Sequence, residues 1–120
     1  MKSGARRDSP RIHALVLAAG EGQRLRPLTA RVPKPLLPLG GRPLLEIVLA
    51  NLRRAGTAKF AINVHHLADR LTAAVTDSPF ARDIRIYREA TLLGTGGPLV
   101  NARDLLSASD LFLLHNGDIL

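Results

Sequence analysis

The stretch IHALVLAAGEGQRLRPLT, residues 12–29, decides the fold class that this sequence predicts. Its first part, Ile12–Ala19, is a nearly continuous apolar run, which is typical of a strand buried on both faces of a sheet. The run leads directly into Gly20 and Gly22, followed by Arg24. Glycines directly after a buried strand let backbone N–H groups approach phosphate oxygens, because no side chain intervenes. We therefore interpret the segment as a strand followed by an anion-binding loop.

Two common phosphate-binding patterns do not fit this loop. A dinucleotide fingerprint requires a third glycine where Leu25 stands, and it should open a helix rather than run into prolines. The P-loop pattern G-x-x-x-x-G-K-[ST] does not occur in the sequence. An ordinary tight turn remains an alternative, although it would not explain why Arg24 and Arg26 lie inside it.

A second segment, PKPLLPL at residues 33–39, surrounds one lysine with prolines. Proline restricts both its own backbone and that of the preceding residue. The pattern therefore predicts that Lys34 is held out on a stiff, extended segment. The alternative is a proline-rich loop that contains a lysine incidentally.

Strands and helices are predicted to alternate along the rest of the chain. Such alternation implies right-handed crossovers and a parallel sheet with helices on both faces. We therefore predict an α/β fold, a Rossmann-like three-layer sandwich with a mostly parallel sheet whose strand-end loops meet at one ligand-binding rim. The expected helices are Pro43–Ala55, with an apolar stripe of Leu44, Ile47, Val48 and Leu52, then Leu67–Thr76 and Gly97–Leu106; the further strands are Lys59–Val64, Ile84–Arg88 and Leu111–Leu114, the last of them buried.

Composition limits the class of protein. Hydrophobic residues make up 46% of the 120 residues and aromatic residues only 3%, which favours an aliphatic core and leaves few rings for stacking nucleic-acid bases. The net charge of +7 gathers in residues 1–11, a predicted flexible basic tail, and around the glycine-proline loop. We expect no nucleic-acid partner and no membrane span, and the absence of cysteine favours the cytoplasm.

Together the two segments resemble the nucleotidyltransferase family of NDP-sugar pyrophosphorylases. The sequence contains LAAGEGQRLRPLT followed by PKPLLPLGGRPLLE, and both strings match the family pattern almost without a gap. LGTGG at residues 93–97 is similar to the family's base-contacting segment, and NGD at residues 116–118 to its metal-binding strand end. The mannose-1-phosphate guanylyltransferase and N-acetylmuramate-1-phosphate uridylyltransferase branches are the most similar.

The resemblance implies a nucleotide-binding part in residues 12–120, with particular roles for its residues. The expected substrates are an NTP, with UTP or GTP favoured, and a sugar 1-phosphate, and the expected cofactor is Mg²⁺. By this resemblance, Arg24 grips the leaving pyrophosphate, Lys34 neutralises charge on the α-phosphate, Asp118 holds Mg²⁺, and Leu17, Ala18, Ala19, Gly20, Gly22, Thr95, Gly96 and Gly97 contact the nucleotide.

The resemblance also implies that part of the enzyme domain is missing. The second metal-binding aspartate and the sugar-contacting segments of the family have no counterpart before Leu120, so we expect either a truncated, incomplete domain or a short relative. Alternative functions are a non-catalytic nucleotide-binding or regulatory module and a phospho-alcohol cytidylyltransferase. Neither the sugar nor the oligomeric state follows from the sequence.

Other polar residues receive ordinary interpretations. His65, His66 and His115 lack a regular metal-ligand spacing, and adjacent histidines on a strand point to opposite faces. We interpret them as polar residues at strand ends. The aspartates at positions 69, 77 and 83 are expected to be solvated charges on helices and loops.

Overall fold

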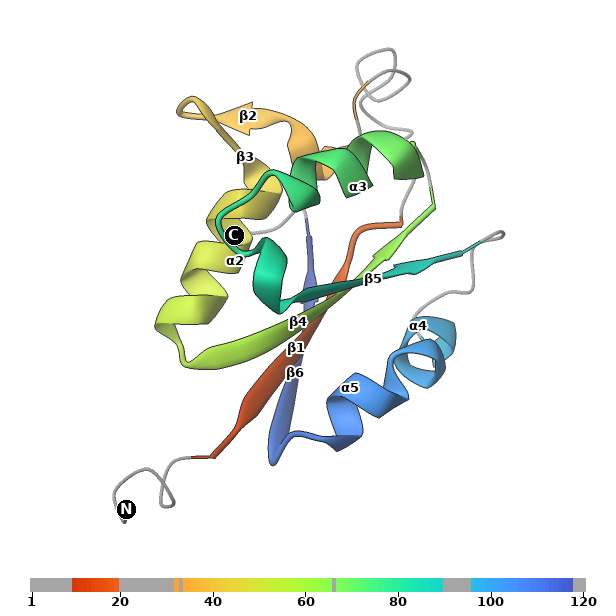
Figure 1. Ribbon diagram of the computed structural model, residues 1–120. Coiled ribbons are helices and arrows are strands. Elements are labelled where there is room, and N and C mark those ends of the chain that lie inside the picture. Colours follow the sequence, from red (N-terminus) through yellow and green to blue (C-terminus); the bar gives the residue numbers. More distant parts are fainter. Residues whose placement is uncertain (1–9, 20–31, 33, 66, 90–95, 118–120) are drawn as a thin grey trace.

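A four-stranded sheet lies at the centre of the computed structural model, which describes residues 10–19, 32, 34–65, 67–89 and 96–117 (Figure 1). All pairings in this sheet are parallel, in the order β5-β4-β1-β6. The strands are β1 (Ile12–Leu17), β2 (Pro38–Leu39), β3 (Arg42–Pro43), β4 (Thr57–Val64), β5 (Ile84–Arg88) and β6 (Leu111–Asn116); the helices are α2 (Leu44–Arg54), α3 (Ala68–Thr76), α4 (Gly96–Asn101) and α5 (Arg103–Ser107), with 3₁₀ turns η3 (Lys34–Leu36) and η4 (Ala81–Asp83).

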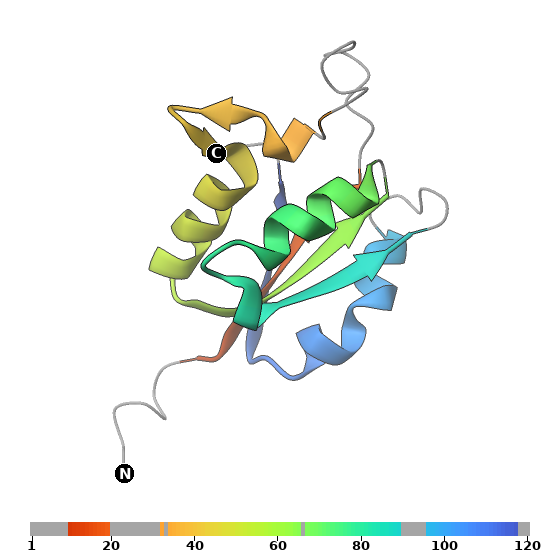
Figure 2. The same ribbon diagram turned by 45° about the horizontal axis from the view of Figure 1, so that its top comes forward.

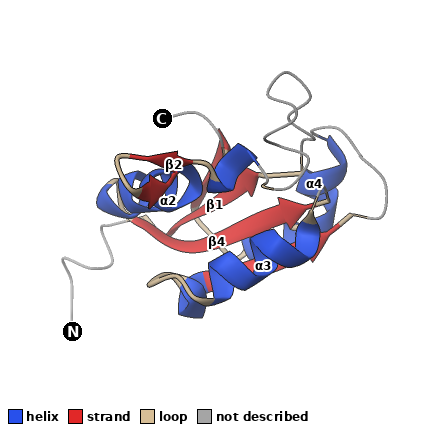
Figure 3. Cartoon of the chain, turned by 90° about the horizontal axis from the view of Figure 1, so that it is seen from above, coloured by secondary structure: helices blue, strands red, loops and turns tan. Residues whose placement is uncertain are grey.

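The helices cover both faces of the sheet, which confirms the predicted α/β layering (Figure 2, Figure 3). On one face, α2 and α3 pack against alternate residues of β1 and β4, such as Val16 and Phe60. On the other face, α4 and α5 cover Leu15 and Ala61. None of the helices in the described ranges is long and apolar enough to cross a bilayer.

Helix α2 follows the predicted boundaries, but a different stripe is buried. Pro43 is its N-cap residue, and Gly56 follows its C-terminus with a φ of +105°, a conformation that favours glycine. The buried side chains are Leu45, Val48, Leu49 and Leu52, whereas Leu44 and Ile47 are only half-buried. The predicted helix is therefore confirmed, but the helix is rotated about its axis by a fraction of a turn relative to the predicted buried stripe.

The single helix predicted for residues 97–106 is instead two short helices. Ala102 separates α4 from α5, with φ of −92° and ψ of 8°, outside regular helical values. Ala102 is fully buried, in one cluster with Leu15 and Ala61 of the sheet. Its carbonyl still accepts a bond of 3.0 Å from the N–H of Leu106, so α5 continues the packing on this face.

Strand β6 is at the edge of the described sheet, and the prediction that it is buried is wrong. Within the part of the chain that the structure describes, it pairs only with β1. Leu111, Phe112 and Leu114 are 50%, 49% and 45% exposed. Its apolar sequence is thus that of an inner strand, while its position leaves one edge and much of its apolar surface uncovered.

Two of the three aspartates expected to be solvated form ion pairs. Asp83, at the amino end of β5, accepts hydrogen bonds from Lys59 at 2.9 Å and from Arg53 at 2.8 Å. These two bonds, that from Lys59 first, lower the pKa of Asp83 below its usual value of 3.8. Asp69 pairs with Arg88. The Asp83 cluster joins α2, β4 and β5 at the amino end of the sheet.

Candidate nucleotide site at the carboxyl rim

The carboxyl end of β1 begins the candidate site. β1 is central, with β4 and β6 as neighbours, so Ala18 and Ala19 directly after it are 3% and 5% exposed. The backbone N–H of Ala18 donates a 2.7 Å hydrogen bond to Oδ1 of Asn63, near the end of β4. Leu17, Ala18 and Ala19, three of the predicted nucleotide-contacting residues, therefore lie at the rim where ligands bind in such sheets.

A chain of buried polar groups extends from this point across the rim. Asn63 and Glu89 are only 3% and 4% exposed, and Nδ2 of Asn63 donates a 2.7 Å bond to Oε2 of Glu89. The N–H of Glu89 donates to the Val64 carbonyl at 2.8 Å, and its own carbonyl lies 2.8 Å from Nδ1 of His65, which donates to it. The ends of β1, β4 and β5 are thus joined through side chains.

Asn63 and Glu89 were not among the residues predicted from the sequence. Two signals could have indicated them: an amide inside the apolar run AINV, and an acidic residue at the end of a strand shortly before LGTGG. Polar residues in such positions are seldom buried unless they are hydrogen-bonded. The contact between them becomes visible only when β4 and β5 are placed side by side.

The end of β6 approaches the same point from the other side of β1. The N–H of Gly117 donates a 2.8 Å bond to the carbonyl oxygen of Leu17. A Cβ at residue 117 would lie 3.1 Å from that oxygen and 3.3 Å from Cγ1 of Val16. A side chain here would force these neighbours to shift by a few tenths of an ångström, so glycine favours the close approach of Gly117 to the end of the central strand.

Lys34 does not lie on an extended segment, so that prediction is wrong. It begins the 3₁₀ turn η3, where the N–H of Leu37 donates to the Lys34 carbonyl at 3.1 Å. The fixed φ of proline is compatible with 3₁₀ geometry, and buried Pro35 anchors the turn. A 3.0 Å bond from the N–H of Leu44 to the Leu37 carbonyl ties the turn to the start of α2. Lys34 is half-buried and is engaged in a non-covalent interaction within the protein.

The remaining predicted residues divide into two groups. Gly96 and Gly97 form the first residues of α4, with Gly97 half-buried and Pro98 after it buried. The others lie outside the described residues: Arg24, Gly20, Gly22, Thr95 and Asp118.

The described ranges contain no group of three or more His, Cys, Asp or Glu side chains that could hold a metal ion. His65 bonds to a backbone carbonyl, His115 is half-buried on β6, and His66 falls outside the description. Asp118 is the residue directly after Gly117, which is held against the end of β1. A carboxylate that follows this position has the donor chemistry that suits Mg²⁺.

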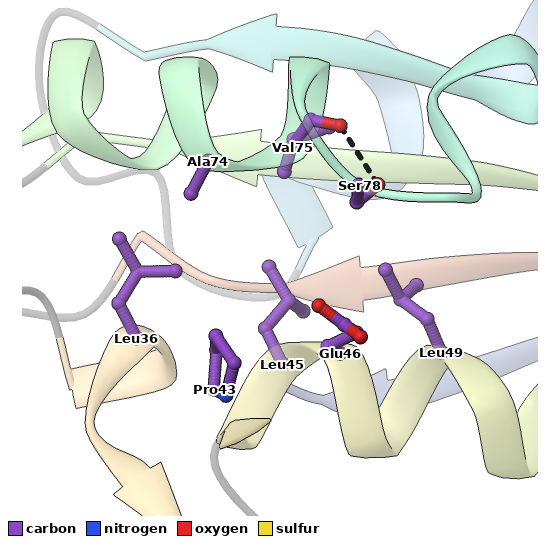
Figure 4. A pocket seen from close by; sticks show the side chains of 8 residues that line it. All are labelled: Leu36, Pro43, Leu45, Glu46, Leu49, Ala74, Val75 and Ser78. Carbon is purple, nitrogen blue, oxygen red and sulfur yellow. Dashed lines mark hydrogen bonds between the residues drawn. The ribbon is translucent and has the colours of Figure 1, made fainter. Parts of the chain in front are cut away.

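A small apolar pocket lies between α2 and α3, in the helical layer rather than on the rim of the sheet. Figure 4 shows Leu36, Leu45 and Leu49 on one side of it and Ala74 and Val75 on the other. None of the predicted nucleotide-contacting residues lines this pocket.

The parallel sheet, with helices on both faces, places the chain in the Rossmann-like α/β class, in which ligands bind at the carboxyl rim. Its central strand is followed by Ala18 and Ala19, and Ala18 is joined through Asn63 and Glu89 to the neighbouring strand ends. The family model "Nucleotidyl transferase" matches residues 13–120, so the chain belongs to the nucleotidyl transferase family.

The curated relatives include two named nucleotidyltransferases. The chain is 39% identical over 110 residues to the mannose-1-phosphate guanylyltransferase catalytic subunit beta of Xenopus tropicalis, covering 89% of this chain and 31% of that protein. It is 40% identical over 109 residues to the N-acetylmuramate alpha-1-phosphate uridylyltransferase of Neisseria meningitidis serogroup B, covering 89% and 47%. The chain thus spans less than half the length of these relatives.

The solved structures agree on the fold. HddC from Yersinia pseudotuberculosis complexed with GMP-PN superimposes with a TM-score of 0.75 and 31% identity, over 88% of this chain and 47% of that one. A UDP-glucose pyrophosphorylase complexed with UDP-glucose gives a TM-score of 0.66 at 22% identity, over 80% and 42%, and shows the fold alone. The two relatives are thus named sugar-1-phosphate nucleotidyltransferases, and the solved neighbours, among them a CTP:phosphocholine cytidylyltransferase with a TM-score of 0.69 and 23% identity, share the α/β fold.

Proposed function

We propose that residues 12–120 form the NTP-binding part of a sugar-1-phosphate nucleotidyltransferase. Residues 1–9 of the basic tail predicted for residues 1–11 lie outside the described residues. The observation that carries the proposal is the convergence of β1, β4, β5 and β6 at one rim, directly where the LAAGEGQR loop leaves the central strand. Membership of the nucleotidyl transferase family supports it. The names of the relatives make GTP and UTP the nucleotides to test.

The proposed reaction needs positive charge and alignment more than proton transfer. An oxygen of the sugar 1-phosphate bonds to the α-phosphorus, the bond between the α-phosphorus and the bridging oxygen breaks, and pyrophosphate leaves with the electron pair. The attacking oxygen is already anionic, so no general base is required, and the barrier lies mainly in charge repulsion and positioning. Cations fixed at the rim lower that barrier because they are in place before charge develops.

We assign the cations by their place in the sequence motif. Lys34 would neutralise charge at the α-phosphate, and its turn is fixed in place by α2. Arg24 would bind the departing pyrophosphate. The family in general depends on a divalent metal ion. Here we propose that Asp118 holds Mg²⁺, which when bound supplies positive charge to the phosphate oxygens.

The nucleotide itself would lie against small residues and backbone groups. The ends of β1 and α4 supply these, with Leu17, Ala18 and Ala19 on one side and Gly96 and Gly97 on the other. Gly20, Gly22 and Thr95 are proposed to complete the surface. We place the reaction in the cytoplasm, which the cysteine-free composition favours.

Binding of Mg·GTP and Mg·UTP to the protein at its native length, measured by titration calorimetry, tests the proposal. Replacing a cation that makes a charge-assisted bond removes about 1.5–3 kcal/mol of binding free energy, so Lys34→Ala and Arg24→Ala should each raise Kd about tenfold or more. Arg54→Ala is the matched control, since Arg54 is exposed at the far end of α2 and loses the same charge.

Binding that is equal in the parent and in both rim variants would contradict the assigned roles. Pyrophosphate release with mannose 1-phosphate, glucose 1-phosphate and N-acetylmuramate 1-phosphate then separates an enzyme from a binding module. NTP binding without release from any sugar 1-phosphate would favour the non-catalytic alternative.

A further inference from the structure

Asn63 lies at the middle of the buried polar chain and uses both halves of its amide. Oδ1 accepts the N–H of Ala18 at 2.7 Å, and Nδ2 donates to Oε2 of Glu89 at 2.7 Å. Only Asn and Gln carry an acceptor and two donors on one planar neutral group, and Gln is longer by one methylene. At this position leucine would remove the acceptor of the Ala18 N–H and one donor to the Glu89 carboxylate. Aspartate would set a second carboxylate against Glu89.

The N–H of Ala18, which donates to Asn63, is the first N–H group after the paired residues of β1. The register of β1 with both neighbours ends at Leu17, opposite Asn63 on β4 and Asn116 on β6. Ala18 is therefore the point where the chain leaves the sheet and begins the LAAGEGQR loop. A side-chain acceptor at this point fixes the direction of departure without extending the sheet, because it replaces the next rung of the ladder.

Glu89 holds the same place at the neighbouring strand end. It follows β5, whose last residue is Arg88, and precedes the segment that leads to LGTGG. Its N–H is bonded to the Val64 carbonyl, so its backbone is fixed to β4 and its side chain to Asn63. One amide thus sets the starting points of two segments that the proposed function assigns to phosphates and base.

We infer that Asn63 is a positioning residue for nucleotide binding: it fixes the backbone where the phosphate loop leaves β1 and, through Glu89, the start of the base segment. The inference rests on the proposed function. A purely structural Asn63 would contribute to folding stability and leave the NTP affinity of the folded protein unchanged. A positioning residue changes that affinity while the protein remains folded, because misplaced backbone donors no longer reach the phosphates.

The test is an exchange of the two side chains. In N63D/E89Q the aspartate accepts from the Ala18 N–H, as Asn63 does, and from the new glutamine amide, so the bond between residues 63 and 89 is restored with reversed polarity at the same net charge. N63D alone brings two carboxylates together, and N63L removes both bonds. Asn51→Leu is the control, because Asn51 is exposed on α2. Each variant is made at native length and measured at a temperature where it is folded.

Two readouts are expected to change together. In N63L, which removes the acceptor, the Ala18 amide should exchange hydrogen about tenfold faster or more, and Kd for Mg·GTP or Mg·UTP should rise by about tenfold or more. N63D keeps an oxygen acceptor but sets it against the Glu89 carboxylate, so both changes should have the same direction and be smaller. N63D/E89Q should restore both quantities to within about threefold of the parent. Should N63L not fold, the comparison of N63D with N63D/E89Q carries the test.

Three results would overturn the inference. Unchanged Ala18 exchange in N63L and N63D would show that Asn63 does not hold this backbone. Faster exchange with unchanged Kd would leave Asn63 a structural residue only. Restored exchange without restored affinity in N63D/E89Q would show that the Glu89 carboxylate, not the geometry, is what the nucleotide needs. A parent that binds neither nucleotide refutes the proposed function instead, and the Ala18 exchange still reports the backbone contact.

Discussion

Replacing Gly117 by alanine tests whether the close approach of β6 to β1 sets up the rim. A Cβ there would lie 3.1 Å from the Leu17 carbonyl oxygen and 3.3 Å from Cγ1 of Val16. Neither neighbour can move easily, since one is backbone of the central strand and the other is fully buried. Overpacking of this kind destabilises by about 1–3 kcal/mol. We expect β6 to shift outward and its 2.8 Å bond to Leu17 to lengthen.

Urea unfolding of Gly117→Ala at native length measures the loss of stability, and titration of Mg²⁺ at a fixed NTP concentration measures the effect on the site. The proposed Mg²⁺ ligand directly follows residue 117, so the Mg²⁺ requirement should rise along with the loss of stability. Ser107→Ala is the control, because Ser107 is exposed at the end of α5, away from the NGD segment. A Gly117→Ala protein within about 0.5 kcal/mol of the parent, with the same Mg²⁺ requirement, would refute the reasoning.

Three further predictions concern packing and charge. Because Lys59 and Arg53 lower the pKa of Asp83, ionised Asp83 stabilises the folded parent above pH 3.8, and this stabilisation is lost as the pH falls through the lowered pKa. The urea midpoint of Asp83→Asn should therefore fall less in acid than that of the parent, by under about 1 kcal/mol because the partners are exposed. Among the described residues, the buried Tyr87 hydroxyl has no hydrogen-bond partner, so thermal unfolding of Tyr87→Phe should match the parent or show up to about 1 kcal/mol more stability. Phe112→Lys should reduce self-association of the 120-residue chain in sedimentation, since Phe112 lies on an unpaired apolar edge of the described sheet; equal association in both proteins would contradict this.

The parts of the fold that depend on local patterns could be predicted from the sequence. β5 has the predicted bounds, and β1 and β4 differ by two residues at one end. Buried strands of aliphatic residues and one alternating strand are local signals that tertiary contacts did not override. Their alternation with helices was enough to give the parallel sheet and its carboxyl rim.

The rest depended on contacts between distant residues. The edge position of β6 is decided by which strands lie beside it, and its apolar sequence carries no such information. Ala18 and Asn63 are 45 residues apart in the chain, and Asn63 and Glu89 are 26 apart, so no period reveals that they meet. Lys34 was misjudged because proline permits both extended and 3₁₀ geometry, and the packing of Pro35 decided between them.

The acidic side chains at the two ends of the sheet differ in burial: Asp83, at the amino end, is partly exposed, whereas Glu89, at the carboxyl end, is 4% exposed. At the amino end, Asp83 and its partners are partly exposed, so water satisfies what the ion pairs do not, and no function is needed to explain them. At the carboxyl end, Asn63 and Glu89 are almost fully buried, where an unpaired polar group would be costly. An aliphatic pair would pack there with less risk to folding. The amide of Asn63 and the carboxylate of Glu89 instead fix the backbone at Ala18, where the glycine loop begins. Fixed backbone donors are what the proposed nucleotide binding at this rim requires.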